Sequence, residues 1–262
     1  MDAPPGHLDH EATIDALEQE LTRTVALAEE TPADLPVPTC PGWSAADLWD
    51  HLGTVHRWVT EILATRSTER VSRRKLVIEG PTGGRWAPWM ADGADRLLAA
   101  LRSTAPDEPV WTWGADQRAR WWARRQLHET VVHDADAALA LGDGFEVPAA
   151  VAADGICELL DNLPVRLAWP DAVVPTAEAT LHLHATDGSD VLPGDAGEWM
   201  VTVGDGTITY SHGHGKGDAA VRGPVRDLML VVNRRVRPEE AGVEVLGDPG
   251  ALRAALDALA LN

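Results

Sequence analysis

The sequence is poor in cysteine and has no long apolar run, and each shortage excludes a class of protein. Only two of its 262 residues are cysteines, Cys40 and Cys157. Two cysteines are too few for a disulfide framework or a cysteine-based zinc site. No apolar run is long enough for a transmembrane helix, and the N-terminus lacks the basic and apolar regions of a signal peptide. These absences predict a cytoplasmic protein.

Basic residues are also scarce. The chain has 22 Lys and Arg against 41 Asp and Glu, which gives a formal net charge of −19. Such a field repels phosphate backbones and anionic lipid, so neither nucleic acid nor a membrane is an expected partner. A local basic pocket could still accept an anionic small molecule.

The spacing of apolar residues changes character along the chain. Steps of three and four residues predict helices over 10–30, 45–66, a segment starting at Pro88, 116–141 and 148–168. After Pro175 the pattern alternates with period two. It predicts strands over 180–186, 198–203, 206–212 and 243–247, and helices from Val225 and from Pro249. The predicted fold class is therefore α+β, with a helical domain over 1–172 and a small α+β domain with an antiparallel sheet over 173–262.

Two of the expected helices carry polar residues that face inward. Glu129 and His133 stand four residues apart, so they project from one face of their helix. His51 interrupts the apolar stripe of the second helix. Facing helices of a bundle build metal sites from such side chains, and His51, Glu129 and His133 would supply three ligands and leave a position open, as in catalytic zinc sites. From spacing alone, a surface ion pair and an ordinary core histidine stay open as alternatives.

The chain resembles the mycothiol-dependent maleylpyruvate isomerase family in PTCPGWSAADLWDHLGTVHRW (38–58), PVWTWG (109–114) and ARWWARRQLHETVVHDADAAL (119–139). Later segments such as TLHLHATDG, EWMVTVGDG and VEVLGD are similar to the same family. The resemblance implies a DinB-like four-helix bundle followed by a small α+β domain. It also implies a divalent metal, usually zinc, bound by His51, Glu129 and His133, and mycothiol as the thiol cosubstrate.

The chemistry implied by the resemblance is that of a metal thiolate. A metal-bound thiol loses its proton at neutral pH and can then add to an electrophile. The enzyme would be either a thiol S-transferase or a cis–trans isomerase of the maleylpyruvate type. The resemblance implies that an arginine of the C-terminal domain contributes to activity, and Arg222 is the candidate, since arginine pairs well with the carboxylate of an anionic substrate. An ion pair of Arg222 with an acid of its own domain, which would only support the fold, stays open as the alternative.

Other functions stay open on the sequence alone. One is a non-catalytic metal-binding regulatory or interaction module, and another is a metal-dependent hydrolase of a thiol conjugate, in which the metal activates water. The sequence does not identify the electrophile. Asp50 and Asp136 are candidates for orienting a ligating histidine, and solvated surface acids stay open as the alternative for both. Cys40 is expected to be structural.

Overall fold

The structure is a computed structural model that describes residues 4–170, 172, 175 and 177–259. It divides into two compact units, His10–Phe145 and the pair of segments Met1–Asp9 and Glu146–Asn262. None of the helices in the described ranges is both long and apolar enough to cross a membrane.

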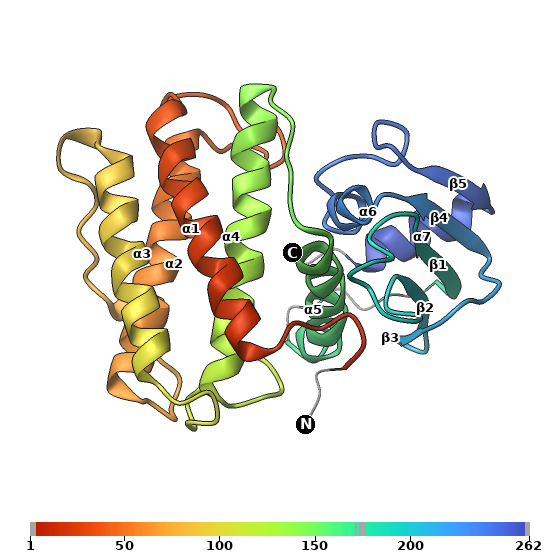
Figure 1. The fold of residues 1–262 in the computed structure, drawn as a ribbon, viewed down its shortest axis with the longest axis horizontal. Coiled ribbons are helices and arrows are strands. Elements are labelled where there is room, and N and C mark those ends of the chain that lie inside the picture. Colours follow the sequence, from red (N-terminus) through yellow and green to blue (C-terminus); the bar gives the residue numbers. More distant parts are fainter. Residues whose placement is uncertain (1–3, 171, 173–174, 176, 260–262) are drawn as a thin grey trace. The chain divides into compact units, whose positions relative to one another are not determined.

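The first unit is a bundle of four helices (Figure 1). They are α1 (His10–Glu30), α2 (Ala45–Thr65), α3 (Trp86–Ser103) and α4 (Ala119–Leu141), with the short 3-10 helices η1 (Arg73–Lys75) and η2 (Thr82–Gly84) between α2 and α3. α1 and α2 each pack against both α3 and α4. Leu48, Trp49 and Leu52 of α2 are fully buried in the core. The predicted four-helix bundle is confirmed.

Caps fix the start of α2 and the end of α4, the two helices that carry the candidate ligands. The Ser44 side chain accepts a hydrogen bond from the Asp47 backbone, and the Asp47 carboxylate accepts one from the Ser44 backbone at 2.8 Å. This reciprocal pair is a capping box, and it fixes where α2 begins. α4 ends at Gly142, whose φ of 78° is the left-handed conformation that glycine adopts without strain.

The second unit combines helices with a five-stranded sheet (Figure 1). The helices are α5 (Ala149–Leu167), α6 (Val225–Val232) and α7 (Pro249–Ala258), and the strands are β1 (Ala179–Ala185), β2 (Glu198–Gly204), β3 (Thr207–His212), β4 (Ala219–Gly223) and β5 (Glu244–Gly247). The strand order is β3-β2-β1-β4-β5. β1 and β4 run parallel and the other neighbours run antiparallel. The sheet is therefore mixed rather than purely antiparallel, because the chain crosses over after β3 and adds β4 on the far side of β1.

Helix α5 groups with the sheet. It packs against α6 and β3 within the second unit, and its residues 151–160 are all buried. The expected boundary at 172/173 instead assigns this helix to the first domain. The two assignments differ because a helix that is buried on nearly all sides belongs to the unit whose elements cover it. The elements that pack on α5, namely α6 and β3, come later in the chain. Cys157 lies fully buried in α5 and accepts a hydrogen bond from the Trp199 indole at 3.2 Å, so it serves packing.

Candidate metal centre

The structure brings His51, Glu129 and His133 together where α2 meets α4. His51 Nε2 lies 3.0 Å from Glu129 Oε1, and His133 Nε2 lies 3.6 Å from the same oxygen. The three donor atoms all lie within 4.8 Å of one another. The two imidazole rings stand edge to face, 5.0 Å apart at 74°, so both rings turn a nitrogen toward one carboxylate oxygen.

The helices explain why these three side chains meet. Glu129 and His133 share a face of α4 because they are separated by four residues. The His133 side chain is 9% exposed, whereas those of His51 and Glu129 are 25% and 21% exposed. The cluster is thus anchored in the core at His133 and reaches solvent on the side of His51.

Two charged neighbours orient the candidate ligands. Arg125 donates to Glu129 Oε2 at 2.8 Å, which turns the other oxygen, Oε1, toward the histidines. His133 Nδ1 lies 2.8 Å from the fully buried carboxylate of Asp136. A proton on Nδ1 suits that acidic partner, and Nε2, which faces Glu129, is then the nitrogen that can carry a second proton or bind a metal ion.

The electrostatics of the cluster favour a cation. Burial alone would lower the pKa of His133, but hydrogen bonds with Asp136, Cys40 and Glu129 outweigh it and hold that pKa well above its ordinary value. Burial would likewise raise the pKa of Glu129, but hydrogen bonds from both histidines and the charge of Arg125 hold it well below its ordinary value. A positive charge between the two groups is therefore stabilised, whether a proton or a metal ion carries it.

Two residues of the loop before α2 complete the surroundings. The Trp43 ring lies 5.1 Å from the His51 ring and stacks on the His133 ring at 6.3 Å and 24°. Cys40 Sγ donates to Asp136 Oδ2 at 3.4 Å. Sequence reasoning did not assign Trp43 to the site. The available signal was its position directly before the helix cap Ser44, which places it at the end of α2 that carries His51.

Other polar residues near the candidate ligands in the sequence, and Arg222, take different positions. Asp50 is exposed on α2, so Asp136 is the acid that contacts a candidate ligand. His56 is fully buried with Nε2 3.2 Å from Thr130 Oγ1, and burial lowers its pKa to about 3. Arg222 belongs to β4 of the second unit, where its half-exposed guanidinium lies 3.7 Å from Glu244. Its catalytic role stays a prediction.

Comparisons with known proteins agree on the domain content. Residues 14–138 match the model of the mycothiol maleylpyruvate isomerase N-terminal domain, and residues 150–254 match the MDMPI C-terminal domain. Two similar solved structures are the crystal structure of the mycothiol-dependent maleylpyruvate isomerase and that of a histidine-to-alanine mutant of it. Each has a TM-score of 0.59 and 14% identity, with 91% of this chain and 93% of that chain covered. At this identity the likeness shows a shared fold. No curated protein matches the chain.

Proposed function

The chain belongs to the mycothiol maleylpyruvate isomerase family, and we propose that it is a mycothiol-dependent isomerase whose divalent metal ion is held by His51, Glu129 and His133. The observation that carries this proposal is the convergence of two imidazole nitrogens on one oxygen of Glu129. We further propose zinc as the ion, because two nitrogens and one carboxylate oxygen are typical of open zinc sites.

The donor set fits such an ion. Tetrahedral zinc with bonds of about 2.0–2.1 Å separates its ligand atoms by roughly 3.3 Å. The two histidine nitrogens lie 3.0 Å and 3.6 Å from Glu129 Oε1, so small side-chain shifts would admit the ion. Asp136 supplies the carboxylate that a ligating histidine normally contacts through its other nitrogen.

Each residue near the ion would have a separate task. When bound, zinc supplies one chemical effect, which is to keep a thiol deprotonated at neutral pH. Asp136 holds the His133 ring in the tautomer that presents Nε2, and Arg125 holds Glu129 with Oε1 turned inward. Trp43 covers the rings of both histidines.

The reaction then proceeds on the thiol and the substrate. The thiolate of mycothiol adds to one carbon of the cis double bond, and the electron pair moves onto the conjugated carbonyl as an enolate. The former double bond is now single and rotates. The enolate then expels the thiolate and restores the double bond in the trans form. Because the thiol is regenerated, mycothiol acts as a cofactor and is not consumed.

Elemental analysis of purified variants tests the metal assignment. His133→Ala and Glu129→Gln should each lose one equivalent of metal relative to the wild type, together with isomerase activity. Asp50→Asn is the matched control, because this acid adjoins His51 but is exposed, and it should keep both metal and activity. Unchanged metal content in both ligand variants would refute the assignment.

Measuring the concentration of free mycothiol during turnover tests the reaction type. During turnover of maleylpyruvate, an isomerase leaves the concentration of free mycothiol constant. An S-transferase would instead consume one thiol per product. If mycothiol is lost in step with the substrate, the enzyme is an S-transferase and not an isomerase.

A further inference from the structure

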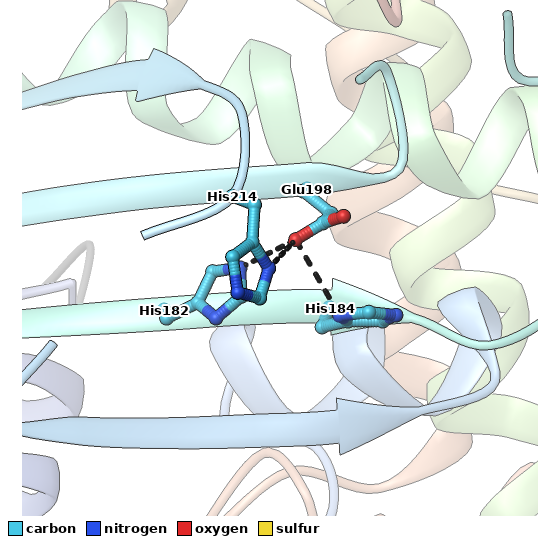
Figure 2. A group of neighbouring side chains, drawn as sticks. All are labelled: His182, His184, Glu198 and His214. Atoms are coloured by element: carbon cyan, nitrogen blue, oxygen red, sulfur yellow. Dashed lines mark hydrogen bonds and ion pairs between the residues drawn. The ribbon is translucent and has the colours of Figure 1, made fainter. Parts of the chain in front are cut away.

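Four side chains of the second unit form a cluster that the proposed reaction does not use (Figure 2). His182 Nε2 and His214 Nδ1 each lie 2.8 Å from Glu198 Oε2, and His184 Nδ1 lies 3.4 Å from the same oxygen. Figure 2 shows the three imidazoles directed at this one carboxylate. All four donor atoms lie within 4.8 Å of one another.

The sheet places three members of the cluster. His182 and His184 are two residues apart on β1, so both project from the face opposite Leu181 and Leu183, which are buried in the core. The antiparallel register sets His184 directly across from Glu198 on β2. Cross-strand partners stand close enough for their side chains to interact, and the pairing is fixed because the other face is buried.

The fourth member comes from the 213–217 loop, the segment GHGKG between β3 and β4. Gly213 donates a backbone hydrogen bond to the Glu198 carbonyl at 3.2 Å. At the other end, the carboxylate of Asp218 accepts from the Thr180 backbone at 2.9 Å and from its hydroxyl at 2.7 Å. A Cβ on Gly217 would lie 2.9 Å from the Thr180 carbonyl. Only glycine permits this close approach, so the loop is held onto the sheet at both ends with His214 over the cluster.

Hydrogen bonds alone do not account well for this arrangement of side chains. One carboxylate oxygen offers about two lone-pair directions, but three imidazole nitrogens converge on Glu198 Oε2. A metal ion bound between the four side chains would instead accept a lone pair from each imidazole nitrogen and from the carboxylate. The separations of 2.8–3.4 Å from that oxygen are also near the roughly 3.3 Å between ligand atoms of tetrahedral zinc.

We propose that His182, His184, Glu198 and His214 form a second metal site, which binds a divalent transition-metal ion and fastens the 213–217 loop to the sheet. Three imidazoles and one carboxylate suit zinc and its neighbours in the transition series. Four protein ligands complete a tetrahedron, which is the pattern of structural rather than catalytic zinc sites. The site shares no ligand with the proposed isomerase centre, because all four of its ligands belong to the other compact unit.

Zinc titration of the metal-free full chain tests this proposal. The wild type should bind two equivalents that survive dialysis. His214→Ala should bind one, or bind the second at least about tenfold more weakly; its side chain is 77% exposed, so the substitution spares the core. Lys216→Ala, in the same loop but outside the cluster, is the matched control and should bind two. With Co²⁺ in place of zinc, His133→Ala should keep visible absorption bands of tetrahedral nitrogen and oxygen coordination, and adding Glu198→Gln to that variant should abolish them.

Hydrogen exchange of the 213–217 amides gives a readout that needs no variant. Zinc should slow exchange there in the wild type. His133→Ala separates the two sites: if it still binds one equivalent, the sheet site is present whatever becomes of the isomerase centre. A wild type that binds a single equivalent, lost in His133→Ala and kept in His214→Ala, would overturn the second site and leave the cluster a hydrogen-bonded network. Zinc that dialysis removes from the sheet site, or loop exchange that zinc leaves unchanged, would overturn it too.

Discussion

The substitution Asp136→Asn tests whether the proposed isomerase centre depends on a residue that never touches the ion. Asp136 is fully buried and accepts from His133 Nδ1 at 2.8 Å. Asparagine has nearly the same shape and can still accept this hydrogen bond, but it carries no charge. His133 then becomes a weaker donor of electrons to a metal through Nε2. Removing such outer partners typically lowers metal affinity by about 10–100-fold, or about 1.4–2.7 kcal/mol.

A competition titration against a chromophoric zinc chelator at pH 7 measures this change. Cys40→Ala is the informative companion, because it removes the 3.4 Å thiol contact to Asp136 and leaves the contact between Asp136 and His133. It should change zinc affinity less than about threefold, since a thiol is a weak donor. If a folded Asp136→Asn variant binds zinc as tightly as the wild type, Asp136 does not tune the ligand and the reasoning fails.

Three further predictions concern stability and substrate binding. The pKa of His56 is lowered by burial from 6.5 to about 3, so its stabilising contribution is complete above pH 6.5 and declines by about 1.4 kcal/mol per unit as the pH falls toward 3. Urea unfolding of metal-free His56→Gln should lack that part of the pH dependence, and an unchanged slope would contradict the burial argument. Gly53→Ala would place a Cβ 2.1 Å from the Trp89 ring and should destabilise the bundle by about 1–3 kcal/mol, whereas Gly80→Ala meets nothing within 4 Å and should melt like the wild type. Arg222→Ala should raise KM for an anionic substrate while the melting temperature falls by no more than about 4 °C, because its exposed ion pair contributes at most about 1 kcal/mol; normal kinetics would remove Arg222 from the reaction.

Most helices of the first unit could be predicted from residues that lie close together in the sequence. The helix predicted over 10–30 spans His10–Glu30, and the one predicted over 45–66 spans Ala45–Thr65. The helix predicted to start at Pro88 begins two residues earlier, at Trp86, because a proline fits anywhere in the first turn. Such elements are predictable because their spacing, caps and breakers lie within a few residues of one another.

Features that depend on distant pairing were not predictable in this way. Strand β4 (Ala219–Gly223) has two alanines and no clear alternation, and it exists because β1 and β5 pair with it. The cluster on the sheet needs a strand register that joins His184 to Glu198 and a glycine loop that brings His214 back. Asp136 was one of two candidate acids one turn or less from a ligand, and only packing shows that it, and not Asp50, is buried against a histidine.

The net charge of −19 acts in opposite directions on the proposed ion and the proposed substrate. A strongly negative field raises the local concentration of divalent cations and repels an anionic substrate such as maleylpyruvate. Metal loading is therefore helped by the field, and the three donors at His51, Glu129 and His133 would leave a position open for a thiol. Substrate capture instead needs a local positive charge, and the effect of Arg222→Ala should grow as ionic strength falls, because less salt screens the repulsion that the arginine offsets.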